Sequence, residues 1–244
     1  MHIIDSAVRL ACDNGRLVAD DWLRQMDACG ISHAVVAPAD EHVAVYNREG
    51  NDQIADLVDH HPEKLTGLAV ANPWFGQHAV DVLRRAFDRG LAGLYLHPTR
   101  QGFRLTEAIV DPLIEVCIEL RRPIYSYVGT PICAMPFQLA ELARRFPEAR
   151  FVLGHFGYCD FAGYDVIPAA MQAASILVET SCAWRQIVQE AVDRLGADRL
   201  LFGSAYPRSR PELEIDKIRS LDLIPGDRQK VLCDNARTLW GISI

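Results

Sequence analysis

The stretch "RLLFGSAYPRS" runs from Arg199 to Ser209. Its apolar part predicts a short buried strand, and the Gly, Ser and Pro residues after it predict a tight loop. Similar apolar runs recur along the chain, at residues 2–5, 33–38, 65–72, 92–97, 123–128, 150–155, 175–180 and 200–203. They are rich in Val, Ile and Leu and almost continuously hydrophobic, which is typical of parallel strands that are covered on both faces.

The stretches between these strands have helical periodicity and end at Gly or Pro. In "LVADDWLRQMDACG" (17–30), Leu17, Trp22 and Met26 share one face, and Gly30 ends the helix. Eight strands alternating with about eight helices predict a (β/α)₈ TIM barrel, an α/β fold that forms a single domain over residues 1–244. A doubly wound open sheet is the alternative, but no GxGxxG motif follows the first strand.

Composition excludes several classes of partner. The chain has 244 residues, half of them hydrophobic, so it can bury a substantial core. A net charge of −7 argues against a nucleic-acid partner. No apolar run reaches the roughly 18–20 residues that span a bilayer, and the first residues do not resemble a secretory signal. The seven cysteines include no CxxC pair, so we expect reduced thiols and a cytoplasmic location.

Seven segments resemble the amidohydrolase superfamily, in its amidohydrolase-related branch of metal-dependent hydrolases, decarboxylases and lactonases. They are "HIID" (2–5), "GLYLHPTRQGF" (93–103), "RRPIYSYVGTP" (121–131), "FPEARFVLGHFG" (146–157), "ILVETS" (176–181), "LLFGSAYP" (200–207) and "DNARTLWGI" (234–242). The resemblance covers nearly the whole chain in matching order. It implies the barrel fold and, because barrels of this family are often dimers, a homodimer.

Most of the metal ligands that the resemblance implies are missing. Where the family has a His-x-His pair after the first-strand aspartate, this chain has Ala7 and Arg9. Tyr127 replaces the fifth-strand histidine, Ala205 replaces the eighth-strand aspartate, and only the sixth-strand His155 remains. A catalytic zinc needs three protein ligands and an open position, and Arg9 adds a fixed positive charge. We therefore expect no metal and no other cofactor.

The catalytic candidates lie at the carboxyl ends of the predicted strands, where barrel enzymes place their chemistry. His155 is the expected general base or acid, because its ordinary pKa lies near neutrality. Tyr127 could donate a hydrogen bond to a developing oxyanion. Its ring could equally fill the volume that a metal and its water would occupy.

The substrate-binding candidates follow the same strands. They are Arg9, His97, Arg100, Tyr206 and Arg208. Converging arginines form clamps for carboxylates or phosphates, so the expected ligand is a small anion. A salt bridge from Arg9 to Asp5 is the structural alternative for that arginine.

Three functions remain open. The first is a metal-independent hydrolase or lyase that acts on a small carboxylate or lactone. The second is a non-catalytic protein that keeps the pocket and binds a small molecule. The third is a regulatory subunit, a pseudoenzyme of the same fold that pairs with an active relative.

Overall fold

Eight parallel strands form a nearly closed barrel in the computed structural model, which describes residues 2–13, 16–158 and 162–243. In barrel order the strands are β1 (Ile4–Arg9), β4 (His33–Ala37), β5 (Leu65–Val70), β6 (Gly93–Leu96), β7 (Ile124–Tyr127), β8 (Phe151–Gly154), β9 (Ile176–Glu179) and β10 (Leu200–Leu201). Every neighbouring pair is parallel. The predicted (β/α)₈ TIM barrel is therefore confirmed.

The barrel closes between its first strand and the segment that follows its last. The amide of Ser6 donates to the carbonyl of Phe202 at 2.9 Å, and the amide of Arg9 donates to the carbonyl of Tyr206 at 3.0 Å. A parallel bridge joins Val8 to Tyr206. These contacts fix the loop after β10 against the end of β1. Residues from the first strand and from the segment after the last strand of the barrel therefore lie in one site.

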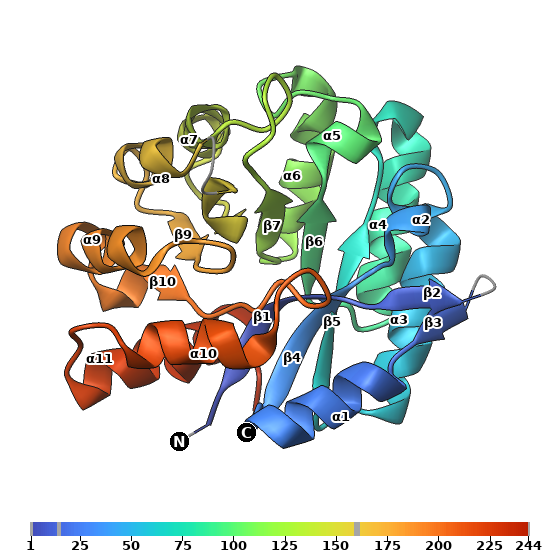
Figure 1. The fold of residues 1–244 in the computed structure, drawn as a ribbon. Coiled ribbons are helices and arrows are strands. Elements are labelled where there is room, and N and C mark those ends of the chain that lie inside the picture. The colour runs from blue at the N-terminus through green and yellow to red at the C-terminus, as the bar shows by residue number, and fades with distance from the viewer. Residues whose placement is uncertain (1, 14–15, 159–161, 244) are drawn as a thin grey trace.

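Helices surround the sheet (Figure 1). The longer ones are α1 (Asp20–Cys29), α3 (Asn47–His60), α4 (Gln77–Asp88), α6 (Asp111–Glu119), α7 (Pro136–Arg145), α8 (Gly163–Ala170), α9 (Arg185–Leu195) and α10 (Pro211–Arg219). Shorter ones are α2 (Asp40–Val43), α5 (Pro98–Gln101), α11 (Pro225–Gln229) and α12 (Asn235–Trp240). Among the described residues, none of the helices combines the length and hydropathy that a bilayer crossing requires.

Two apolar layers hold the fold together. Strand residues that face outward, such as Leu94, Leu96 and Leu153, pack against the surrounding helices. Strand residues that face inward, such as Leu68 and Val152, fill the barrel. The inner layer continues into the C-terminal segment, whose members are Cys233, Ala236, Leu239, Trp240 and Ile242. Residues 233–242 therefore seal the end of the barrel opposite the carboxyl ends of its strands.

The structure differs from the sequence-based expectation near the N-terminus. We expected a helix from Leu17, but Arg16–Val18 form strand β3, which pairs with β2 (Ala11–Asp13) in a hairpin, and α1 begins at Asp20. The first barrel strand also extends to Arg9 rather than ending near Asp5. Helical spacing of apolar residues does not reveal a short strand directly before a helix, because an apolar residue such as Leu17 fits either element.

Trp240 tests the seal at the closed end. It is 5% exposed, and its ring lies so near Gly93 that a Cβ there would stand 2.9 Å away. We expect Trp240→Ala to lower the free energy of unfolding by about 3–5 kcal/mol, because it empties a large buried volume.

Urea unfolding measures the change, with Leu213→Ala as the control. Leu213 is 61% exposed on α10, and its truncation should change stability by less than about 0.5 kcal/mol. Equal effects of the two substitutions would contradict the seal.

Candidate active site

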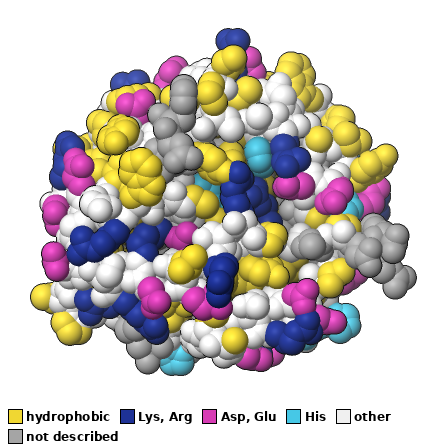
Figure 2. Space-filling model, in the orientation of Figure 1, with side chains coloured by type: hydrophobic (Ala, Val, Ile, Leu, Met, Phe, Trp, Pro, Cys, Tyr) yellow, Lys and Arg dark blue, Asp and Glu magenta, His cyan; other side chains and the backbone are white. Residues whose placement is uncertain are grey.

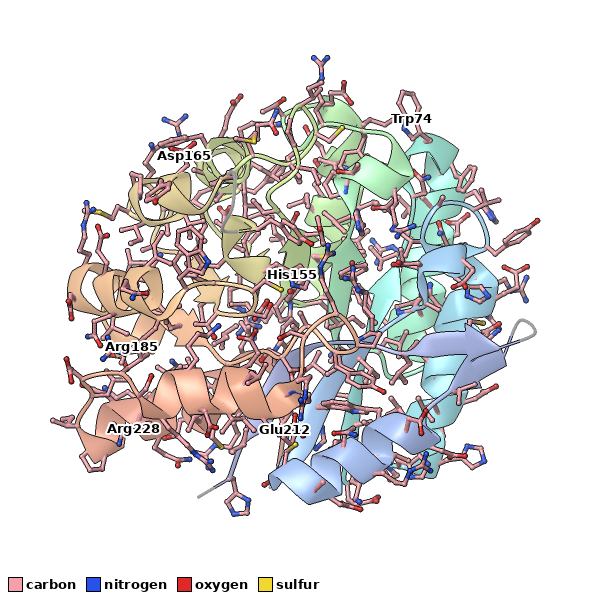
Figure 3. All side chains as sticks on the ribbon, in the orientation of Figure 1. Trp74, His155, Asp165, Arg185, Glu212 and Arg228 are labelled. Carbon is pink, nitrogen blue, oxygen red and sulfur yellow. The ribbon has the colours of Figure 1, made fainter. Side chains whose placement is uncertain are left out.

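The predicted site residues gather at the carboxyl ends of the strands. Figure 3 shows His155 near the middle of the ring of strands, with Trp74 and Arg185 at the periphery. Backbone strain concentrates at the same end. Among the described residues, seven other than glycine have positive φ, and six of them follow barrel strands: Ile132, His155, Phe156, Tyr158, Cys182 and Ala205. Such strain is often kept at functional sites.

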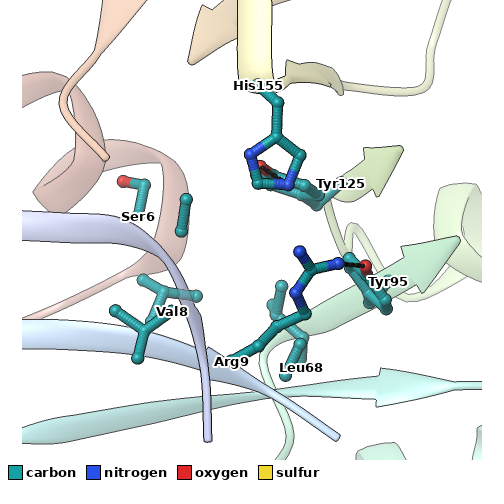
Figure 4. Close-up of a pocket in the computed structure, with 10 residues that line it drawn as sticks. Ser6, Val8, Arg9, Leu68, Tyr95, Tyr125 and His155 are labelled. Carbon is teal, nitrogen blue, oxygen red and sulfur yellow. Dashed lines mark hydrogen bonds between the residues drawn. The ribbon is translucent and has the colours of Figure 1, made fainter. Parts of the chain in front are cut away.

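Arg9 ends β1 and points into the barrel mouth, where Figure 4 shows it beside Tyr95, Tyr125 and His155. Its Nη1 donates to the Tyr95 hydroxyl at 2.9 Å. The guanidinium carbon lies 5.6 Å from the centre of the Tyr127 ring. Its nearest carboxylate is Asp40, at 3.9 Å. The guanidinium is thus a cation that is held in place by aromatic residues and is largely shielded from solvent.

The alternative pairing of Arg9 with Asp5 is wrong. Asp5 Oδ1 accepts the amides of Ala7 (3.0 Å) and Ser204 (2.9 Å). Burial raises the pKa of Asp5 to about 6. Asp5 therefore joins the first strand to the loop after the last one, while Asp40 is the carboxylate beside Arg9.

His155 is buried and oriented by a hydroxyl. Its Nδ1 lies 2.9 Å from Ser181 Oγ, and that hydroxyl donates to Glu179 Oε2 at 3.0 Å. Because the serine's one hydrogen goes to Glu179, its oxygen accepts a hydrogen bond from a protonated His155 Nδ1. This arrangement leaves Nε2 unprotonated.

The Nε2 atom of His155 faces the mouth cavity. Its nearest polar neighbour is the Tyr125 hydroxyl at 3.5 Å, which donates its hydrogen to Glu179 Oε2 at 2.8 Å instead. Burial lowers the pKa of His155 well below its ordinary 6.5, and the charge of Arg9 lowers it further. The ring is therefore a neutral proton acceptor at physiological pH.

Glu179, the last residue of β9, is fully buried among four donors. They are the Tyr125 hydroxyl, the His155 amide, and the amide and hydroxyl of Ser181. Burial raises its pKa to about 7, although each of these bonds favours the ionised form. The carboxylate fixes both the backbone and the side chain of the histidine loop.

Tyr127 acts through its ring. It stacks on His97 with centroids 4.1 Å apart and planes 8° apart, and it lies 4.9 Å from the His155 ring. Burial lowers the pKa of His97 to about 3, with further lowering by Arg9 and Arg100. The ring contacts both imidazoles, and the volume-filling role that we expected for it remains a prediction. The oxyanion role of its hydroxyl remains a prediction.

The other predicted binding residues lie farther out. Arg100 pairs with Asp40 at 2.6 Å. Arg208 lies over the ring of Tyr158, 4.2 Å from its centre. Tyr206 instead packs its ring against Trp22, 4.8 Å away, so its backbone rather than its side chain supports Arg9. Figure 2 shows Lys and Arg side chains grouped with a histidine near the middle of this face.

Arg9 lines two separate spaces at the mouth. The inner cavity, lined also by Tyr95, Tyr125 and His155, has a volume of about 10 Å³, which is about the space of one water molecule. The outer depression measures about 370 Å³ and is lined also by Asp40, Glu41, Pro207 and Arg208. A small ligand would fit the outer space, with Arg9 between it and His155.

The side chains at the mouth do not suit a divalent metal. Within the described part of the chain, no three His, Cys, Asp or Glu side chains form a group that could hold one. His155 Nδ1 is engaged with Ser181, and the Glu179 oxygens already accept four hydrogen bonds. The charge of Arg9 also opposes a second cation. No step below is therefore assigned to a metal.

Sequence reasoning missed four residues of this site: Tyr95, Tyr125, Glu179 and Ser181. A signal was present for the first two. Tyr95 and Tyr125 stand two residues before His97 and Tyr127, and side chains two apart on a strand share a face. Glu179 was also a carboxylate at a strand end, but only the fold shows that it bonds to residues from three different strands.

NMR can test the proton on His155. We expect long-range ¹H–¹⁵N spectra to show Nδ1 protonated and Nε2 unprotonated from pH 8 down to about pH 5.5, because the pKa lies well below the ordinary value. Ser181→Ala should weaken the preference for this tautomer. A proton on Nε2, or charging of the ring near pH 6.5, would contradict the arrangement.

Comparisons with known proteins bear on the fold of this chain. A family profile described as amidohydrolase matches residues 13–242. Similar solved structures include an uncharacterized TIM-barrel protein from Bordetella bronchiseptica, with a TM-score of 0.82, 17% identity and 99% of each chain covered. Another is 5-carboxyvanillate decarboxylase from Sphingomonas paucimobilis, with 0.80, 16% and 99% of each chain.

A dihydroxybenzoic acid decarboxylase from Polaromonas, determined with bound manganese, has a TM-score of 0.76 and 18% identity over 98% of this chain and 97% of that chain. No curated protein matches the sequence. At these identities, the structural likeness establishes the fold.

Proposed function

This chain belongs to the amidohydrolase family, and we propose that it is a metal-independent hydrolase or lyase that acts on a small carboxylate or lactone. One observation carries the proposal: a fixed cation and a neutral imidazole line the same cavity. Arg9 is held by Tyr95, and His155 is held by Ser181. A positioned guanidinium can stabilise developing negative charge, which is a task that metals perform in other hydrolases.

Lactone hydrolysis would use both groups. His155 Nε2 takes a proton from water as the water oxygen bonds to the acyl carbon. Arg9 stabilises the negative charge that develops on the carbonyl oxygen. The ring C–O bond then breaks, and His155 returns the proton to the leaving oxygen. The inner cavity has room for the water, and the outer depression has room for the lactone.

An anionic substrate would also make His155 a better base. The charge of Arg9 is the largest contribution after burial to the low pKa of His155. A carboxylate bound at Arg9 would offset that charge, so the pKa of the imidazole would rise toward neutrality. The substrate would thus bring the base closer to its most effective range.

The state of His155 favours hydrolysis over decarboxylation. Loss of carbon dioxide leaves a carbanion that requires a proton donor, whereas this imidazole is neutral and offers a lone pair. The decarboxylases of similar fold act on carboxylates, which is consistent with an anionic ligand here. Their likeness to this chain is one of fold, so it does not decide which reaction this chain performs.

A second function, non-catalytic binding of a small anion or a regulatory role, is favoured by the size of the inner cavity. Its volume of about 10 Å³ admits no substrate group unless Arg9 moves. Asp40, close to both Arg9 and Arg100, also competes with an incoming carboxylate. A pocket that only binds would need no more than the outer depression.

A substrate screen separates the two functions. We expect the full chain, treated with chelator, to hydrolyse a member of a panel of small lactones. His155→Asn should lower kcat by about 10²–10⁴-fold, the usual contribution of a general base. His78→Asn, an exposed histidine on α4, is the matched control and should leave kcat unchanged.

Two other outcomes would contradict this proposal in different ways. Full activity in His155→Asn would remove the imidazole from the mechanism. Absence of turnover, together with saturable binding of small carboxylates that Arg9→Met abolishes, would support the binding function.

A further inference from the structure

A second group of arginines lies at the opposite end of the barrel from the mouth. Arg121 and Arg122 directly precede β7, and Arg150 directly precedes β8. These three residues line a depression of about 420 Å³ together with Cys117, Ile118, Glu148 and Ala149. The depression shares no lining residue with the two spaces at the mouth.

The three guanidinium groups lack acidic partners. Among the described residues, no carboxylate lies within 4.0 Å of Arg121, Arg122 or Arg150, although most other arginines of the chain form ion pairs. Glu148 is the one acid in the lining, so the depression carries a net formal charge of +2 in a chain of net charge −7. This concentration of positive charge would attract an anion.

Two of the arginines are held in place. Arg150 Nη2 donates to the carbonyl of Arg121 at 2.9 Å. The Arg122 guanidinium lies 5.6 Å from the centre of the Phe87 ring, and its buried Nε has no hydrogen-bond partner. A buried donor without a partner is uncommon in proteins.

The backbone at Arg121 adds an independent observation. The residue has φ of +54° and ends α6 with its amide bonded to Ile118 O at 3.1 Å, while the Arg122 amide bonds to Cys117 O at 2.7 Å. Glycine is the usual residue in this position, because it has no Cβ to strain. Among the described residues, three α-helices end in left-handed glycines, at Gly30, Gly102 and Gly241, and one 3₁₀ turn at the mouth ends in the left-handed Tyr158. An arginine at this strained position costs stability relative to glycine, which suggests that its side chain serves a function in the depression.

We propose that this depression binds a small phosphate-bearing metabolite. Guanidinium forks match the oxygens of a phosphate, and several unpaired arginines suit a multiply charged group better than a single carboxylate. Ile118, Cys117 and Ala149 give the depression an apolar side for the organic part of the ligand. The site is independent of the chemistry proposed at the mouth.

Isothermal titration of the full chain with pyrophosphate tests the site, at constant ionic strength maintained with sodium chloride. We expect saturable binding that Arg122→Gln and Arg150→Gln each weaken by about tenfold or more, since each loses a charge-assisted hydrogen bond. Arg48→Gln is the matched control. It removes the same charge from an exposed site on α3 and should leave the affinity unchanged.

Arg121→Gly gives the sharpest result. It should weaken pyrophosphate binding and yet raise the melting temperature by about 2–4 °C, because it removes both the cation and the backbone strain. Arg208→Gln should not affect binding.

Three results would overturn the proposal. One is no saturable binding. Another is an equal loss of affinity in Arg122→Gln and Arg48→Gln, which would indicate general electrostatics. The third is a loss in Arg208→Gln alone, which would place the anion at the mouth.

Discussion

The buried carboxylate of Glu179 is the constraint on which the mouth of the barrel depends. It accepts hydrogen bonds from a residue of β7, from the turn after β8 and from the turn after its own strand. A fourth element approaches so closely that only glycine fits, because a Cβ at Gly203 would collide with Glu179 Oε1. The ends of four consecutive strands thus lie around one acid. The burial that this requires raises the pKa of Glu179 to about 7.

The charge pattern of the mouth follows from this arrangement. Glu179 and Ser181 hold His155 with a free Nε2, while Tyr95 holds Arg9 within the same cavity. Because both rings are buried and a permanent cation is already present, the imidazoles of His97 and His155 remain neutral. A cation and a neutral base together can polarise a carbonyl and accept a proton, which in many barrels requires a metal.

Much of the fold could be predicted from the sequence, because short, continuously apolar strands and helices that end at Gly or Pro are local signals. The strand ends also predicted where Arg9, His97 and His155 would meet. The role of Glu179 could not be predicted, since two of its partners, Tyr125 and His155, lie 54 and 24 residues away in the sequence. Tyr206 shows another limit of the sequence. Its backbone lies beside the end of β1, as a residue of the mouth should, but its ring packs on Trp22 instead of facing the ligand space. A short strand end fixes the backbone, whereas local packing decides which way a side chain turns.

If Arg9 supplies the positive charge that a metal supplies in other barrels, the protein should bind no metal, and elemental mass spectrometry measures this. The measurement uses the untagged chain, purified without chelator and dialysed. We expect no stoichiometric zinc, iron or manganese, since the described residues of the mouth provide two imidazoles, an acid already bonded to four donors and a fixed cation, where a catalytic zinc needs three protein ligands. A full equivalent of any of these metals that survives dialysis would contradict it and would return metal-assisted hydrolysis as the mechanism to test.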